Sequence, residues 1–329
     1  MTQAILFSSL ISCFKHPTIT VIYVGLLSIV MILNLGSLIL QPSFSEIISY
    51  GKNGTALSNC NCVVFRMDNI QDYWVRAGQL AAMNQFIFRN QSVTLGIIMD
   101  SLGDDSEIIN KIKQGSASGL FELATHGWAF TDYTKLSQEQ QRNSLSDSER
   151  KMIELFGNAS QIFIPPYGSF NDDTINAMKQ VDAKILTGNM SSFDQLELKG
   201  NNNESQTILS SSMQSKDISY IPATISFKDY HGGAYTRNSI QSIFNNGTQS
   251  IGTYGYAVIA IQPQDFMQID ANGDPTDVVD ENQINDLSRL IDFMLSNNIR
   301  VGSFSELTAE TQSKDDIIMP SSNSTSQIS

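Results

Sequence analysis

Short apolar, β-branched runs alternate with stretches of helical periodicity from Asn59 to Leu307, and this alternation most constrains the fold. Strands separated by helices predict parallel strands joined by crossovers, and a long series of such units favours a barrel or a wound sheet. The predicted strands are Cys62–Met67, Val93–Met99, Gly119–Thr125, Gln161–Ile164, Lys184–Thr187, a segment around Ile218–Ile225, Tyr256–Gln262 and Ile299–Phe304. The fold class is therefore α/β.

Helices are predicted between these strands, and two segments fall outside the alternation. The predicted helices are Tyr73–Phe88, Ser106–Lys113, Ser137–Phe156 and Asn282–Asn298, the last with apolar residues at helical spacing. Lys199–Lys216 is rich in Asn and Ser and is interpreted as a solvated excursion. Residues 309–329 are polar and lack periodicity, which predicts a disordered tail after a domain spanning 59–308.

The N-terminal region has a different character. No charged residue occurs from Pro17 to Ser45, and residues 17–41 are long enough as a helix to cross the hydrocarbon layer. We expect a short flank at 1–16, a single transmembrane anchor at 17–41 and a linker at 42–58, with the domain on the extracytoplasmic side. Seven Asn-x-Ser/Thr sites follow the anchor and permit a glycosylated outer domain: Asn53, Asn90, Asn158, Asn189, Asn203, Asn246 and Asn323.

Net charge and cysteine content narrow the partners and the chemistry. The 329-residue chain carries a formal charge of −13, which argues against nucleic-acid binding because that requires basic patches. Three cysteines are too few for a disulfide scaffold. Only Asn61 separates Cys60 from Cys62, so a bridge between them would close a very small ring. We therefore expect two thiols rather than a labile disulfide.

Polar residues follow three of the predicted strands. Asp68 and Asn69 follow the first, His126 ends the third, and Pro165-Pro166-Tyr167 follows the fourth. Because the carboxyl ends of parallel strands meet at one edge, these residues are expected at a common mouth, where such folds hold their functional groups. For His126 alone, a structural histidine with backbone partners is the competing interpretation.

The ordered motifs resemble those of the polysaccharide deacetylase family, the NodB-type carbohydrate esterases. The matching runs are Asp68 to Trp74 (DNIQDYW), Glu122 to Trp128 (ELATHGW), Phe163 to Asn171 (FIPPYGSFN) and Gln262 to Phe266 (QPQDF), and their wording looks most like an anchored archaeal branch. The resemblance implies a deformed (β/α) barrel that hydrolyses acetyl groups on a carbohydrate polymer. It also implies a divalent metal, normally zinc, held by one Asp and two His.

Carried over residue by residue, the resemblance makes Asp68 the base and His126 a metal ligand, with Asn69 at the second ligand position. Tyr167 and Pro166 keep the motif that stabilises the developing oxyanion. Three positions depart from the family pattern. Asn69 replaces a ligand Asp, Phe130 replaces the second ligand His, and Gln262 replaces a late His that acts as general acid. Ile164 also replaces a frequent Arg.

Two hypotheses follow from these departures. The first is an anchored deacetylase acting on amide-linked or ester-linked acetyl groups. The second is a pseudoenzyme without metal that binds glycan or assists envelope assembly, with Trp74, Trp128 and Tyr167 as sugar-stacking residues near the mouth. Asp132, His231 and Asp72 are candidate substitute ligands, although each is more readily explained as a loop residue or a helix cap. A purely structural envelope role is a third alternative.

Overall fold

A computed structural model describes residues 60–189, 218–231 and 234–315. The chain divides into two units, Met1–Ser49 and Tyr50–Ser329, and the first lies wholly outside the described residues. The predicted anchor at 17–41, the linker at 42–58 and the excursion Lys199–Lys216 also lie outside them. Within the described residues, no helix combines the length and the apolar character needed to cross a membrane.

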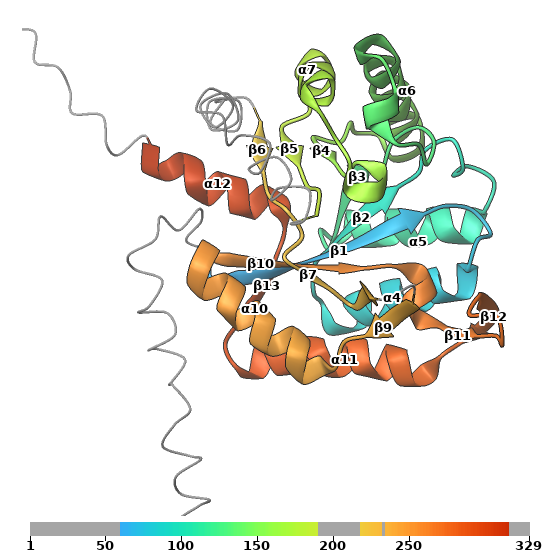
Figure 1. Ribbon diagram of the computed structural model, residues 1–329, viewed down its shortest axis with the longest axis vertical. Helices are drawn as coiled ribbons and strands as arrows, with labels where there is room; N and C mark the ends of the chain where they lie inside the picture. The colour runs from blue at the N-terminus through green and yellow to red at the C-terminus, as the bar shows by residue number, and fades with distance from the viewer. Residues whose placement is uncertain (1–59, 190–217, 232–233, 316–329) are drawn as a thin grey trace, which may run out of the picture. The chain divides into compact units, whose positions relative to one another are not determined.

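A nine-stranded sheet in the order β6-β5-β4-β3-β2-β1-β10-β7, with β13 also on β1, forms the centre of the domain (Figure 1). All of its pairings are parallel. All nine residues of β1 are buried, as expected for a strand covered on both faces. The strands are β1 Cys62–Ile70, β2 Val93–Ile97, β3 Phe121–Thr125, β4 Ile162–Phe163, β5 Ile185–Leu186, β6 Ser219–Tyr220, β7 Ile225–Ser226, β10 Tyr256–Ile261 and β13 Arg300–Gly302.

The sheet is strongly curled, because one short segment bonds to both of its ends. Residues 219–220 pair with β5, and residues 225–226 pair with β10. Between them, Ala223 donates its N–H to the Gly188 carbonyl, and Thr224 donates to the Val258 carbonyl. The curled parallel sheet with surrounding helices fits the predicted α/β class.

Helices connect the strands and cover the sheet (Figure 1). They are α4 Arg76–Arg89, α5 Ser106–Ala117, α6 Gln138–Phe156, α7 Asp172–Gln180, α10 Ile240–Tyr254, α11 Glu281–Ser296 and α12 Phe304–Asp315, with short 3-10 turns η3 Tyr133–Lys135, η4 Pro166–Gly168 and η5 Pro263–Phe266. Their boundaries follow local chemistry. Helix α6, for example, begins at a capping box of Ser137 and Gln140 and ends at Gly157 in the left-handed conformation.

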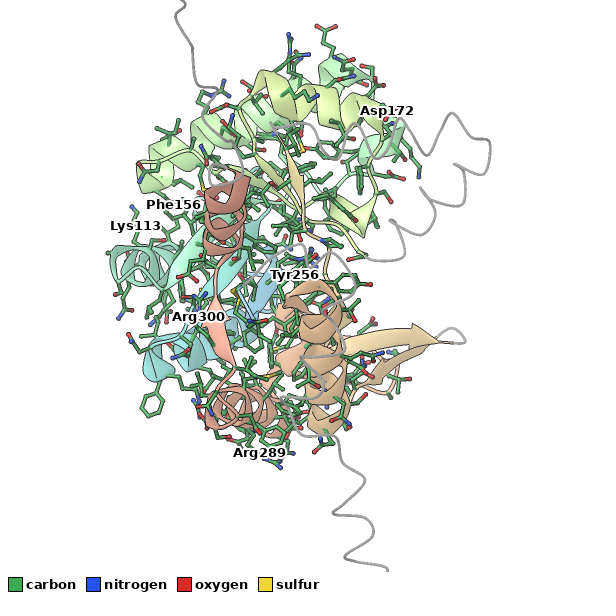
Figure 2. All side chains as sticks on the ribbon, turned by 90° about the vertical axis from the view of Figure 1, so that its left-hand side faces the viewer. Lys113, Phe156, Asp172, Tyr256, Arg289 and Arg300 are labelled. Carbon is green, nitrogen blue, oxygen red and sulfur yellow. A yellow bond between two sulfur atoms is a disulfide. The ribbon has the colours of Figure 1, made fainter. Side chains whose placement is uncertain are left out.

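The main core lies between β1 and the helices that pack below it in Figure 1, α4 and α11. Phe65 of β1 packs edge-on against Phe86 of α4, with ring centroids 5.3 Å apart. Charged side chains such as Lys113 and Arg289 point outward from their helices (Figure 2). This arrangement leaves the carboxyl ends of the strands and their loops available for a site.

Several local expectations need correction. The first strand continues to Ile70, so Asp68 and Asn69 lie within it rather than after it. Helix α12 reaches Asp315, inside the segment predicted to be a disordered tail. The sequence pattern did not predict two antiparallel hairpins, because their strands are short and exposed or polar. They are β8 Lys228–His231 with β9 Ala234–Arg237, and β11 Met267–Ile269 with β12 Pro275–Val279.

The cysteine prediction was wrong in this structure. Cys60 and Cys62 form a disulfide across Asn61, which adopts a left-handed φ of 45°. The bridge lies at the start of β1, where the N–H of Asn61 also donates to the Gly255 carbonyl at 2.8 Å. The left-handed turn at Asn61 lets the two side chains face each other over one intervening residue.

Candidate functional site

The strand ends that carry the predicted site residues meet at one edge of the sheet. Thr125 pairs with Ile97 on one side and with Phe163 on the other, so His126 and Ile164 follow at the same level. On the other side of β1, Met67 pairs with Ile261, which brings Gln262 to the level of Asp68. The expectation of a common mouth therefore describes the observed geometry.

A bulge in β1 sets the direction of the first motif. The pairing with β2 shifts register between Met67 and Ile70, and Asn69 takes a left-handed φ of 64°. Bulges of this kind redirect side chains beside functional sites. Opposite the bulge, Gly96 provides space, because a Cβ there would lie 3.3 Å from Asp68 Oδ1 and 2.8 Å from the Ile164 side chain.

Asp68 is paired with a buried arginine from its own strand. Arg66 Nη2 lies 2.8 Å from Asp68 Oδ2, and both side chains are almost completely buried. Arg66 Nη1 also donates to the carbonyl and hydroxyl of Thr187 at 2.9 Å and to the Gly188 carbonyl at 3.1 Å. Arg66 Nε and Asp68 Oδ1 have no hydrogen-bond partner among the described residues. Sequence reasoning missed Arg66, although its i,i+2 spacing from Asp68 places both on one face of a strand.

His126 is fully enclosed, and both of its ring nitrogens have partners. Nδ1 lies 2.7 Å from the Ile164 carbonyl, which can only accept, so Nδ1 carries a proton. Burial is the largest influence on the ring and lowers the pKa of His126, so the imidazole is neutral. Nε2 is then an acceptor, and the atom of the Asn69 carboxamide placed 3.1 Å from it is Oδ1, which is also an acceptor. The amide orientation that satisfies this contact turns the NH₂ group toward Nε2.

The aromatic residues of the mouth lie above this histidine. The Phe130 ring centroid is 5.5 Å from that of His126 and 4.6 Å from that of Tyr167. Phe130 is 42% exposed and Tyr167 is 61% exposed. Tyr167 follows the buried Pro166 in η4 and adopts a left-handed φ of 60°. Phe130 therefore occupies the space next to His126 where a second imidazole was expected.

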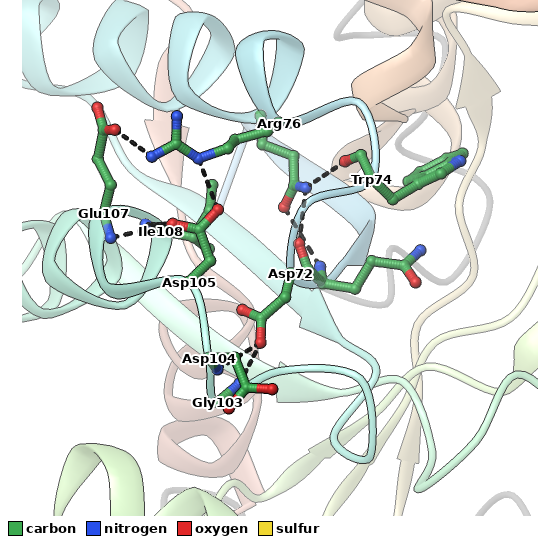
Figure 3. A network of polar contacts seen from close by, with 10 residues as sticks. Asp72, Trp74, Arg76, Gly103, Asp104, Asp105, Glu107 and Ile108 are labelled. Atoms are coloured by element: carbon green, nitrogen blue, oxygen red, sulfur yellow. Dashed lines mark hydrogen bonds and ion pairs between the residues drawn. The ribbon is translucent and has the colours of Figure 1, made fainter.

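The two tryptophans sit on different loops of the same edge. Trp128 is half-buried, packs against the main core and carries Lys151 Nζ 5.6 Å from its ring centroid. Trp74 is half-buried in the loop after β1. In Figure 3 its ring points away from the polar network that surrounds its backbone.

That network fixes the loop between β1 and α4 (Figure 3). Asp72 accepts backbone N–H groups from Gly103 and Asp104, each at 2.6 Å. Gln79 donates to the Trp74 carbonyl at 2.6 Å and to the Gln71 carbonyl at 2.8 Å. Asp72 thus joins two loops through its Oδ2 atom, while its Oδ1 atom has no hydrogen-bond partner among the described residues.

The remaining candidates also have local roles. Asp132 accepts from the backbone and hydroxyl of Thr134 and begins η3. Gln262 bonds through its side chain to Gln264, and its backbone N–H donates to Asp265 at 2.8 Å. The backbone of His231 lies in β8, but its side chain is outside the described part of the structure.

The residues present do not fit a divalent metal. Among the described residues, no group of three or more His, Cys, Asp or Glu side chains is placed to hold one. Within the described part of the chain, His126 has its Nε2 directed at an amide, and the Asp68 carboxylate beside it is neutralised by Arg66. A zinc site needs three donors that converge on one point, two of them commonly charged or imidazole.

Comparison with known proteins agrees with the motifs. Residues 90–186, which include β2 to β5 and both the His126 and Pro-Pro-Tyr segments, match the family model described as polysaccharide deacetylase. This segment matches the polysaccharide deacetylase family. No curated protein matches the sequence.

Solved structures similar to this chain have low sequence identity. A CE4 family pseudoenzyme from Bacillus anthracis is 13% identical with a TM-score of 0.49, over 76% of this chain and 66% of that one. A peptidoglycan N-acetylglucosamine deacetylase is 13% identical with a TM-score of 0.48, over 76% and 89%. A family 4 acetyl xylan esterase from Clostridium thermocellum, in complex with a cobalt ion, is 14% identical with a TM-score of 0.45, over 75% and 90%.

Proposed function

We propose that this deacetylase-type domain recognises a carbohydrate polymer at the mouth of its sheet without hydrolysing it through a metal. One observation carries the proposal: the Nε2 atom of His126 faces the Asn69 amide, in the position where a ligand nitrogen would face a metal. A neutral amide binds zinc poorly, and the neighbouring Phe130 supplies no donor at all. The family match supplies the class of ligand.

The charges at the mouth support the same proposal. A catalytic zinc site commonly offsets the ion's two positive charges with at least one free carboxylate or with several imidazoles. Here the Asp68 carboxylate faces the Arg66 guanidinium at 2.8 Å. His126 is neutral because burial lowers its pKa. The mouth therefore has no uncompensated negative charge among these groups with which to attract a divalent cation.

Metal-dependent deacetylation remains the second candidate, and one observation favours it. Asp68 Oδ1 is buried without a partner, at the position that the family assigns to the base. In that case Asp68 would be the base, His126 a metal ligand, and Tyr167 part of the oxyanion site. Unpartnered buried carboxylate oxygens are uncommon in structural ion pairs and need an explanation.

One set of measurements separates the two candidates. Full-length protein in detergent is assayed for bound zinc, for acetate release from acetylated xylan and chitin, and for retention on the same polysaccharides. Retention with less than about 0.1 zinc per chain and no acetate release is expected, because a site with one available imidazole binds zinc weakly. Stoichiometric zinc with turnover that is lost in Asp68→Ala would overturn the recognition proposal.

A reconstructed site provides the matched positive control. Two imidazoles on one tetrahedral zinc place their ring centroids about 5 Å apart. The Phe130 and His126 rings are already 5.5 Å apart. The double substitution Asn69→Asp with Phe130→His should therefore bind zinc where the natural protein does not. Zinc binding at equal affinity by both proteins would contradict the proposal.

The location is proposed from the sequence alone. We propose that residues 17–41 anchor the protein in a membrane and that the domain lies on the extracytoplasmic side, where surface polysaccharides are found. The supporting observation is the charge-free run from Pro17 to Ser45.

A further inference from the structure

We propose that Phe130 and Tyr167 form a stacking platform for one neutral pyranose ring of the polysaccharide. This inference rests on the proposed function and adds a defined contact to it. Phe130 is the residue that occupies the expected second-ligand position. In this proposal the Phe130 ring contacts a sugar at the position where the family's side chain would contact a metal.

The exposure of the two rings is the first support. Large exposed apolar side chains are few among the described residues, and these two lie in contact with each other on separate loops. Their centroids are 4.6 Å apart and their planes are inclined at 48°. The two inclined, exposed rings lie at the carboxyl edge of the sheet, where α/β folds bind their ligands.

The backbone at Tyr167 is the second support. A tyrosine at φ 60° and ψ 5° lies in the left-handed region, a conformation that persists only where its surroundings enforce it. They do so here. Gly168 donates its N–H to the Pro165 carbonyl at 2.9 Å, and a Cβ on Gly168 would lie 2.7 Å from the Asn189 amide. The turn that carries Tyr167 is therefore fixed by its neighbours, and the Tyr167 side chain on it is exposed.

The floor of the platform is rigid and neutral. His126, 5.5 Å from Phe130, is fixed by the Ile164 carbonyl on one side and by Asn69 on the other. Asp68 is compensated by Arg66. A platform without net charge, in a chain of net charge −13, suits a neutral sugar better than an anionic one. The occupant is therefore a hexose or N-acetylhexosamine ring, not a uronic acid.

The test compares ring-deletion variants of the detergent-solubilised full-length protein on immobilised polysaccharides. The probes are neutral chitin, xylan and mannan, with anionic polygalacturonate and hyaluronate for comparison. Phe130→Ala and Tyr167→Ala should each weaken retention on a neutral polymer about tenfold, because each removes one stacking face. Phe130→Tyr and Tyr167→Phe, which keep the rings, should retain binding.

The matched control is Phe88→Ala on α4. Phe88 is 84% exposed, so its removal makes the same chemical change with little effect on folding, and it should leave retention unchanged. If the natural protein binds but both platform variants bind equally well, the platform is wrong and the recognition proposal survives. Binding only to the anionic polymers would also overturn the platform. If the natural protein binds none of the five polymers, the proposed function fails, and the platform with it.

Discussion

Arg66 is the residue on which the polar interior of the mouth depends. Its guanidinium joins β1 to Thr187 and Gly188 after β5 and also compensates Asp68. Removing one partner of a buried ion pair leaves an uncompensated charge, which typically costs about 3–5 kcal/mol. We therefore expect Arg66→Met to lower the free energy of unfolding by about that amount, measured by urea denaturation at pH 7.

A second variant separates the lost charge from the lost packing. Adding Asp68→Asn to Arg66→Met removes the stranded carboxylate and should recover a large part of the loss, since coupled partners are not additive. If the double variant is no more stable than Arg66→Met, the cost comes from the contacts to Thr187 and Gly188 instead.

His126 gives the protein a pH dependence of defined sign. Burial lowers its pKa in the folded state, so the unfolded chain binds more protons as the pH falls. The stabilising contribution of neutral His126 is complete above about pH 6.5 and is lost progressively below it, by at most about 1.4 kcal/mol per pH unit. Unfolding free energies from pH 7.5 to 5.5 should fall more steeply for the natural protein than for His126→Gln. Parallel curves would contradict this assignment.

At the scale of the element, Glu149 on helix α6 gives the protein a pH dependence opposite in sign to that of His126. Burial, with a smaller contribution from Asp182, raises the pKa of Glu149 to about 7. The stabilisation from the protonated carboxyl is present below the ordinary pKa of 4.5 and is lost as the pH rises through 7. Glu149→Gln should therefore stabilise the protein at pH 8, by less than about 1 kcal/mol because Glu149 is only half-buried, and should have no effect at pH 4.5.

The exposed Glu154 on the same helix is the matched control for that variant. Glu154→Gln should leave stability unchanged at both pH values, as judged by thermal unfolding. An equal effect of the two substitutions at pH 8 would show that the net charge of α6 matters and not the site of Glu149.

The elements themselves were predictable where their pattern was long. The amphipathic helix predicted at Asn282–Asn298 is α11, and the β-branched runs at Cys62 and Tyr256 start β1 and β10. Strands β4 to β7 have two residues each, too few for a period to be visible, so their pairing is a product of tertiary hydrogen bonds. The bulge at Asn69 could not be predicted from the sequence either, because it is defined by the register of β1 against the neighbouring strand β2.

The position of the candidate residues could be predicted, but their contacts could not. The motifs singled out Asp68, His126 and Tyr167, and pairing between strands brings their segments to one edge, while their roles in a functional site stay a prediction. Their chemistry depends on partners from other elements or from across a bulge. Arg66 compensates Asp68, and the Asn69 amide faces His126. A motif gives the order of residues along the chain, but it cannot show which side chain fills a neighbour's space.

At the scale of the whole molecule, the proposed anchor has a direct test. Full-length protein should remain with the membrane fraction after extraction with alkaline carbonate, because a helix of residues 17–41 would bury a long apolar surface in the bilayer. A variant that lacks residues 1–58 should appear in the supernatant, as followed by immunoblotting. Release of the full-length protein by carbonate would exclude a spanning anchor.

The position of β1 has a consequence for synthesis of the chain on the ribosome. This early strand pairs with β10 from Cys62 to Met67, and its first residues also pair with β13, both of which are made much later than β1. Until residues 256–261 emerge, one edge of this fully buried strand has no partner and can pair with other chains. A chain stopped before residue 256 should therefore aggregate or recruit chaperones, whereas one stopped after 302 can complete the sheet.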